Sequence, residues 1–333
     1  MQRGLKMIKK VETVKRHAES KTVQSARELL GILAALIIIC IILTFLSEKF
    51  LRITNVITIL RTTSINAIVA VGMTFVILTG GIDLSVGSIM SLGGVLCSLM
   101  IARTNVGILA SLLIGLLAGA AVGFINGMCI TKLRLVPFIV TLATSYVARG
   151  GSYLLTNARP VSIKEEFFYE FGNGMIGNAF PYLIIYMLIV FAIFWILLNR
   201  TKYGRRIFAI GGNEEAARFS GIKIDRIIII TYVLSGVLAA FAGIITCAKM
   251  YSGQPVIGED AAMDAIAGVV LGGTSMTGGF GTLTGTIIGC IIIAVINNGM
   301  NLIGLNSFWQ QVAKGLVILI AVYVDAMKKT RKN

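Results

Sequence analysis

The residues of this chain that could do chemistry are a few polar side chains set inside or beside long apolar runs. Asp83 lies in the segment TGGIDLSVG, between two such runs. A charge at membrane depth is costly and has to face protein or water. Three interpretations of Asp83 stay open. It or Ser85 caps the following helix, it contacts a transported solute, or it lies near the cytoplasmic membrane surface.

Side-chain amides form a second group of candidates. The asparagines within or at the ends of apolar runs can bond across helices or line an aqueous path. NSFWQQ places an aromatic pair at the entrance of the last run, which suits either a membrane-interface belt or a wall of the path. The candidates for the solute path are Asp83, Ser85, Asn66, Asn126, Thr274, Ser275, Asn297, Asn298, Phe308 and Trp309.

Enzyme chemistry has little support in the residue inventory. The single histidine, His17, lies in the basic N-terminal tail, and the 5 cysteines fall in apolar runs with no close pair. Histidine-based catalysis and zinc ligation within the membrane are therefore excluded. The sequence also has no G-x-x-x-x-G-K-[ST] loop for nucleotide phosphates. We expect no metal, no cofactor and no ATP chemistry on this chain.

The composition explains where the polar residues must lie. Of the 333 residues, 56% are hydrophobic and 14% are charged, and the mean hydropathy is +0.88. Soluble domains carry about 25% charged residues, so an ordinary soluble enzyme, a disordered chain and a nucleic-acid-binding module are excluded. The composition predicts an all-α, polytopic membrane protein.

Each membrane span takes about 20 apolar residues. The sequence contains ten candidate runs: Leu29–Ser47, Ile53–Leu78, Ser85–Ile101, Gly107–Ile130, Val136–Thr156, Pro181–Leu198, Ile227–Ala248, Met263–Gly272, Thr282–Met300 and Phe308–Ala326. The eighth run is too short to cross a core of ~30 Å as a straight helix. We interpret it as half of a broken helix.

Basic residues predict the orientation. They concentrate in residues 1–28, in the loop 199–226, at Lys132 and Arg134, and in residues 327–333. Because basic residues near span ends stay cytoplasmic, both tails and both internal breaks should face the cytoplasm, which requires an even number of spans. Residues 29–326 then form the transmembrane domain, and the acidic stretch around Glu165, Glu166 and Glu170 lies outside.

Faint internal similarity suggests two inverted halves of five helices each. FINGM (Phe124–Met128) resembles INNGM (Ile296–Met300), and LTGGIDLSVGS (Leu78–Ser88) resembles LGGTSMTGGFGT (Leu271–Thr282). Chance matches in glycine-rich sequence are the alternative. Glycines also recur every four residues, which predicts close helix packing, at Gly115, Gly119, Gly123 and Gly127 and at Gly281, Gly285 and Gly289.

The longest basic loop carries clear local signals. Gly211–Asn213 predicts a turn, and Asn213 can cap a short helix, EEAARFSG, whose first turn holds two glutamates. Gly221 stands where a helix-ending glycine belongs. A capped helix held between two membrane helices can press into a groove on a soluble partner. The alternative is a loop that only sets the membrane topology.

Four long motifs resemble the permease subunits of bacterial ABC importers for monosaccharides. They are AVGMTFVILTGGIDLSVGSIMSL (Ala70–Leu92), YGRRIFAIGGNEEAARFSGI (Tyr203–Ile222), DAIAGVVLGGTSMTGGFGTLTGTIIG (Asp264–Gly289) and NNGMNLIGLNSFWQQVAKGLVILIAVYVD (Asn297–Asp325). The sequence is most similar to the ribose permease group, which also includes xylose, arabinose, galactose, inositol and autoinducer-2 permeases.

The resemblance implies that GGNEEAARFSGI is a coupling helix that docks on an ATP-binding subunit. The coupling residues would be Tyr203, Gly204, Gly211, Gly212, Asn213, Glu214, Glu215, Ala216, Ala217, Arg218, Ser220 and Gly221. It also implies two permease chains, identical or paralogous, two ATP-binding domains that hold ATP and Mg, and an extracytoplasmic sugar-binding protein. The location would be the cytoplasmic (inner) membrane of a bacterium, with no nucleic-acid partner.

One motif departs from the family's usual pattern. Members usually have G-x-G-Y-E-L-D-A-I-A before the glycine-rich segment, whereas Gly258–Ala267 reads GEDAAMDAIA. The expected function is import of a monosaccharide, with ribose the best candidate, by alternating access driven by a partner ATPase. Inositol, a nucleoside or autoinducer-2 are the alternative solutes. An ion-coupled secondary sugar transporter would need a paired, buried carboxylate or cation site, for which only Asp83 is a candidate.

We expect replacement of both Glu214 and Glu215 by lysine to abolish co-purification with the ATP-binding subunit, because the reversed charges oppose the helix dipole and change the docking surface. Membrane insertion should stay intact and serves as the control. Unchanged assembly and transport would remove the coupling role.

Overall fold

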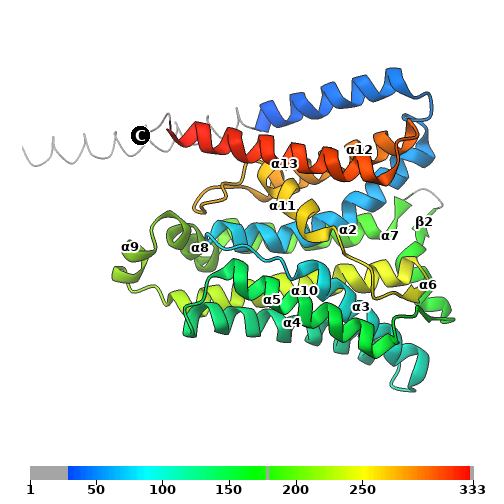
Figure 1. The fold of residues 1–333 in the computed structure, drawn as a ribbon, viewed down its shortest axis with the longest axis horizontal. Coiled ribbons are helices and arrows are strands. Elements are labelled where there is room, and N and C mark those ends of the chain that lie inside the picture. The colour runs from blue at the N-terminus through cyan, green and yellow to red at the C-terminus, as the bar shows by residue number, and fades with distance from the viewer. Residues whose placement is uncertain (1–28, 178–179, 331–333) are drawn as a thin grey trace, which may run out of the picture.

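The computed structural model describes residues 29–177 and 180–330, and these are mostly helical (Figure 1). The helices are an N-terminal helix Leu29–Leu46, α2 (Ile53–Leu78), α3 (Val86–Arg103), α4 (Ile108–Lys132), α5 (Pro137–Thr156), α6 (Glu166–Asn173), α7 (Tyr182–Arg200), α8 (Lys202–Gly212), α9 (Glu214–Phe219), α10 (Ile224–Lys249), α11 (Ala261–Leu271), α12 (Leu283–Leu302) and α13 (Ser307–Thr330). The short strands β1 (Val161–Ser162) and β4 (Ser252–Gly253) pair antiparallel, as do β2 (Met175–Ile176) and β3 (Phe180–Pro181).

The all-α, multi-pass membrane fold predicted from the sequence is confirmed. Among the described residues, 7 helices are long and apolar enough to cross a membrane: the N-terminal helix, α2, α3, α4, α7, α10 and α12. Helices also cover the remaining three predicted runs, as α5, α11 and α13, but the number ten itself stays a prediction. The short run is confirmed as a half-length helix, since α11 has 11 residues and is therefore about 16 Å long.

Several boundaries differ from the prediction. α13 continues to Thr330, past residue 327 where the predicted tail begins, and the position of the membrane boundary there stays a prediction. The acidic stretch forms the unpredicted helix α6, and the basic loop contains a second helix, α8. The tail predicted over residues 1–28 lies outside the described residues.

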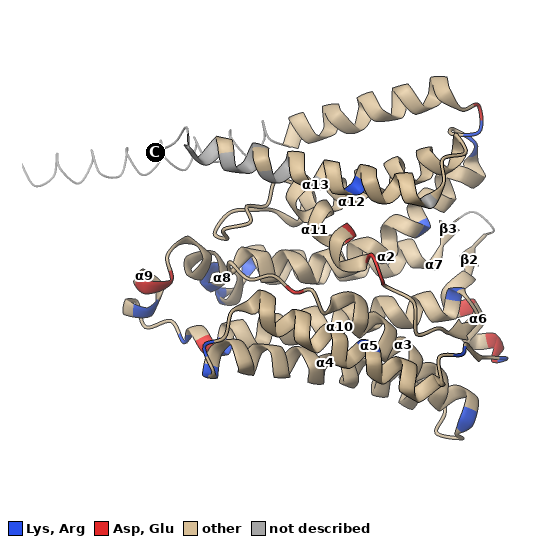
Figure 2. Cartoon of the chain, in the orientation of Figure 1, with Lys and Arg blue, Asp and Glu red and all other residues tan. Residues whose placement is uncertain are grey.

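The bundle has two distinguishable ends, which we call the α9 end and the α6 end after the helices that project there (Figure 1). Charged residues gather mainly at these ends, and the long helices between them are almost free of charge (Figure 2). This distribution is the one expected of a bundle surrounded by lipid.

Two groups of helices share the centre of the bundle. α10 packs against α3 and α4, whereas α2 packs against α11 and α12, and α2 and α10 contact each other. The largest buried cluster is drawn mainly from α2, α7, α10 and α11. α2 and α10 thus each pack on a pair of helices from the other half of the chain. This reciprocal packing agrees with two inverted halves.

Two non-helical segments enter the bundle from opposite ends (Figure 1). Thr79–Ser85 follows α2 at the α9 end and leads into α3, while Gln254–Asp260 follows β4 at the α6 end and leads into α11. In an inverted arrangement these two segments correspond. The similarity of Leu78–Ser88 to Leu271–Thr282 was therefore misleading, because the latter joins α11 to α12.

The glycine stripe of α4 has the packing role that its spacing predicts. A Cβ on Gly119 would overlap the carbonyl oxygen of Gly236 and lie 2.6 Å from the Ala240 Cβ. Gly115, Gly123 and Gly127 also meet neighbouring helices at backbone distance. On α12, Gly289 packs on Gly268 of α11 and Gly285 packs on Gly272, the residue after α11. Gly281 precedes α12 and lies against Thr274, so it is not part of that stripe.

We expect Gly119→Ala to lower the free energy of unfolding by about 1–3 kcal/mol, because the added methyl group forces α4 away from α10. Thermal unfolding of the detergent-purified protein measures this. Gly150→Ala in α5 is the matched control, since a Cβ there meets nothing within 4 Å. Equal stability of the two variants would contradict the close-packing role.

Candidate coupling surface and solute path

α8 connects the last turn of α7 to the centre of the bundle. Thr201 caps it, since its Oγ1 accepts from the backbone N–H groups of Tyr203 (3.1 Å) and Gly204 (3.3 Å). The Tyr203 hydroxyl lies 2.8 Å from Thr231 Oγ1 of α10, and its ring stacks on Phe75 of α2. Burial raises the pKa of the Tyr203 phenol, which therefore stays neutral. α8 is thus fixed to both central helices.

α9 has both of the end signals that the sequence predicts. Asn213 Oδ1 accepts from the Ala216 N–H at 2.9 Å, which confirms the cap. Gly221 has φ +77°, and the Ile222 N–H donates to the Ala217 carbonyl at 3.1 Å, which closes the helix in a Schellman motif. The helix is shorter than predicted and ends at Phe219.

α9 projects from the end of the bundle (Figure 1). Ala217 is buried against the protein, whereas Phe219 is 91% exposed. Glu214 and Arg218 form an exposed ion pair of 2.8 Å along the helix. An exposed aromatic ring at the tip of a rigid projection is a typical anchor for a protein partner. Phe219 was not among the predicted coupling residues, although the sequence places this aromatic residue directly before the Ser-Gly pair that ends the helix.

A groove of about 590 Å³ lies beside α9. Lys132, Arg218, Lys223 and Arg226 contribute positive charge to its lining, and Asp225 pairs with Lys132 at 2.7 Å. The surface around α9 is therefore cationic and hollowed next to a projecting helix, which favours a partner with an acidic, complementary face.

The predicted turn at Gly211 and Gly212 is wrong, because both glycines are the last residues of α8. Their role is close packing. A Cβ on Gly211 would overlap the Leu78 carbonyl oxygen and the Gly279 nitrogen, and the Gly279 N–H donates to Leu78 O at 3.0 Å. Gly278, with φ +83°, packs against Gly80 in the same place.

We call this contact of Gly80, Gly211, Gly212, Gly278 and Gly279 the glycine junction. It brings together the end of α8, the end of α2 and the loop between α11 and α12, backbone against backbone. With no side chains between them to rearrange, a displacement of α8 would be passed directly to α2 and to this loop.

Asp83, Ser85 and Asn126, predicted as separate candidates, meet in one buried network. Asp83 accepts from Ser85 N–H (3.0 Å), Ser85 Oγ (2.5 Å) and Ser235 Oγ (2.9 Å). Asn126 donates to Ser85 Oγ at 2.9 Å and accepts from Thr144 Oγ1 at 2.7 Å. We call these five residues the Asp83 node. It ties the start of α3 to α4, α5 and α10.

The predicted helix cap is not formed, because α3 begins without a side-chain cap hydrogen bond; the Asp83 carboxylate instead binds the N–H of Ser85, the residue before α3, in a local turn. Asp83 is fully buried, with an exposed fraction of 0%, so no solute reaches it in this conformation. The contribution of Ser235 and Thr144 could not be seen in the sequence, because they come from helices remote along the chain.

The other candidates for the solute path do not join this network. Asn298 of α12 and Asn55 of α2 exchange hydrogen bonds of 2.8 and 3.0 Å, which is helix-to-helix bonding. Ser275 pairs with Thr277, and Thr274 is buried in the loop before α12. Phe308 and Trp309 are exposed at the start of α13, and Asn66 and Asn297 are half-buried in α2 and α12.

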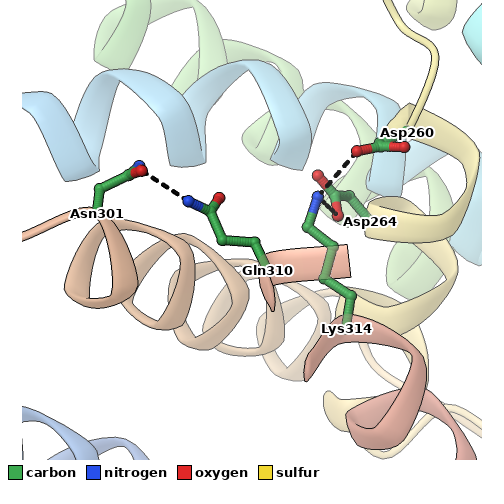
Figure 3. A network of polar contacts seen from close by, with 5 residues as sticks. All are labelled: Asp260, Asp264, Asn301, Gln310 and Lys314. Carbon is green, nitrogen blue, oxygen red and sulfur yellow. Dashed lines mark hydrogen bonds and ion pairs between the residues drawn. The ribbon is translucent and has the colours of Figure 1, made fainter. Parts of the chain in front are cut away.

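The expectation that Asp83 is the only buried carboxylate is wrong. Asp264 of α11 is also mostly buried and forms an ion pair of 3.0 Å with Lys314 of α13 (Figure 3). Lys314 also contacts Asp260 at 3.3 Å. These charged residues lie within or next to apolar runs that are far apart in the sequence, so their ion pairs could be recognised only in the three-dimensional structure.

Comparison with known proteins identifies the family. The family described as "Branched-chain amino acid transport system / permease component" matches residues 55–322. The chain belongs to this permease family. It is 46% identical to the ribose import permease protein RbsC of Bacillus subtilis (strain 168) over 302 residues, covering 90% of this chain and 93% of the relative.

Two further relatives of this permease come from Escherichia coli (strain K12). The ribose import permease protein RbsC is 45% identical over 302 residues, covering 89% of this chain and 93% of the relative. The galactose/methyl galactoside import permease protein MglC is 36% identical over 320 residues, covering 91% and 95% of the two chains. No solved structure gives a significant match.

We expect Gly211→Ala to reduce solute uptake by the assembled transporter on the order of tenfold. The added methyl group costs about 1–3 kcal/mol where the junction is tightly packed. If this cost differs between the two conformations of the transporter, it shifts the equilibrium between them by about tenfold or more. Gly212→Ala is the matched control, because a Cβ on that neighbouring glycine meets nothing within 4 Å. If both variants transport at the wild-type rate, the glycine junction does not transmit motion.

Proposed function

We propose that this permease is the membrane subunit of an ATP-driven importer that moves a monosaccharide, with ribose the best candidate, into a bacterial cell. The observation that carries the proposal is the 46% and 45% identity to ribose import permeases over about nine-tenths of both chains. The galactose permease is more distant, at 36%.

The α9 end would face the cytoplasm. The basic residues of the 199–226 loop and of the α4–α5 break all belong to this end, and basic residues near span ends stay cytoplasmic. α9, with Phe219 at its tip, would insert into a groove of an ATP-binding subunit that holds ATP and Mg. A second permease chain, identical or paralogous, and a sugar-binding protein at the α6 end would complete the transporter.

The proposed mechanism is alternating access. Nucleotide-driven movement of the partner pushes α9, and α8 carries this displacement to the glycine junction. From there it reaches the end of α2 and the loop before α12. The Asp83 node holds Thr79–Ser85 to α3, α4, α5 and α10, so these elements would move as a unit when the path opens to one side or the other.

We expect proteoliposomes with this permease, the ATP-binding subunit and the sugar-binding protein to transport radiolabelled ribose. Transport should occur only when ATP is present on the side of the membrane where the ATP-binding subunit lies. Leucine should not be taken up, and galactose should be taken up more slowly. Uptake by the permease alone, driven by an ion gradient, would overturn the proposal in favour of a secondary transporter. ATP-dependent uptake of leucine but not ribose would overturn the solute class.

A further inference from the structure

Two cations inside predicted spans, Arg149 and Lys314, hold the non-helical segment Gln254–Asp260. We call this segment and Thr79–Ser85 re-entrant, because each enters the bundle from one end. Arg149 of α5 donates to the carbonyl oxygens of Pro255 (2.6 Å) and Ile257 (2.7 Å). Lys314 of α13 contacts Asp260 (3.3 Å) and Asp264 (3.0 Å). Each cation lies seven residues from the end of its helix at the α6 end, which is about 10 Å along the axis. The segment is therefore clamped from two helices at similar depth.

The clamped segment leads to a helix end inside the bundle. Asp260 directly precedes α11, whose N-terminus follows the non-helical stretch from β4. A helix N-terminus carries partial positive charge. In membrane transporters such interrupted helices bring helix ends and irregular backbone to the place where solute binds.

Acidic side chains at this depth are open to the surroundings of the chain. The Asp260 side chain is 50% exposed and Glu259 is exposed as well, whereas Asp83 is fully enclosed. A carboxylate at this depth is too costly to face lipid. The surface at Glu259 and Asp260 therefore does not face lipid, unlike the apolar face of α13, where Val312 and Leu316 are more than half exposed. In the assembled transporter it borders water or the second permease chain, and thiol labelling separates the two.

The charge balance indicates what kind of solute this surface accepts. Lys314 is closer to Asp264 than to Asp260, so Asp260 keeps acceptor capacity on its open side (Figure 3). Glu259 interacts electrostatically with Arg149, so three carboxylates and two cations share this region, and the remaining negative charge disfavours anions such as sugar phosphates. Carboxylate oxygens accept strong hydrogen bonds from hydroxyl groups. Uncharged, polyhydroxylated solutes fit this environment.

We propose that Glu259 and Asp260 line the solute path and that Asp260, positioned by Lys314, accepts hydrogen bonds from the hydroxyl groups of the passing solute. The inference rests on the proposed function for the identity of the solute as a sugar. The location of these residues in an aqueous path rests only on the structure.

Thiol labelling tests the location. Glu259→Cys and Asp260→Cys, in the assembled transporter in native membranes, should react with a charged, water-soluble methanethiosulfonate reagent. Leu316→Cys on the apolar face of α13 is the matched control and should not react. The native cysteines among the described residues are buried or half-buried, and the wild-type protein measures their background. Absence of labelling at both 259 and 260 overturns the proposal.

Protection by ribose tests the contact. We expect ribose, supplied with the sugar-binding protein and ATP, to slow labelling at position 260, and ribose 5-phosphate to have no effect. In the Glu259→Cys background, which keeps Asp260, Lys314→Arg, which keeps the charge, should retain protection by ribose, and Lys314→Gln should weaken it. Labelling that ribose does not slow, in a transporter that carries ribose, overturns the solute contact.

Uptake gives an independent measure. Asp260→Asn should lower ribose uptake per ATP hydrolysed by about tenfold, because a neutral acceptor binds hydroxyl groups more weakly than a carboxylate. Glu48→Gln is the control, an exposed carboxylate in the turn before α2, and should leave this ratio unchanged. An unchanged ratio in Asp260→Asn overturns the proposal. If the wild-type transporter carries no ribose, the proposed function fails, while labelling still decides whether positions 259 and 260 face water.

Discussion

Polar backbone groups inside an apolar bundle must find partners within the protein, and the two re-entrant segments show how this chain meets that constraint. In Thr79–Ser85, the Ile82 carbonyl accepts from Tyr232 and Thr141, each at 3.3 Å. In the opposite segment, Arg149 and Ser91 donate to carbonyl oxygens, including that of Pro255. The polar and charged side chains that stand out in the structure are those that these two segments require.

Breaking two helices gives the bundle parts that can move without unfolding. α3 and α11 each begin within the protein, so each can shift relative to the segment before it while its own backbone hydrogen bonds stay intact. The long helices α2 and α10 cannot do this, because they are packed against glycine-rich partners along their length. A stiff centre with two interrupted helices beside it suits a protein that must open toward either side of a membrane.

The sequence predicted a feature correctly where that feature depends on residues within a single helix. The Asn213 cap and the Gly221 stop depend on neighbours within a few residues, and the α4 glycines follow the period of a single helix. The Asp83 node and the Lys314 ion pairs depend on residues that lie far apart along the chain, so no local pattern reported them. Gly211 was misinterpreted for the same reason, since its neighbour is the end of α2 rather than the next turn of the loop.

Because helices of each half pack on helices of the other half, the centre of the bundle cannot fold until both halves have been synthesised. α2 needs α11 and α12 to cover it, including the contact of Thr74 with Thr286 at 2.9 Å. These helices are synthesised about 180 residues later, which takes roughly 10–40 s at ribosomal rates. During that interval the face of α2 that carries Thr74 has no partner from the second half of the chain. The first half of the molecule is therefore an intermediate that awaits the second, and the finished centre forms only when synthesis is nearly over.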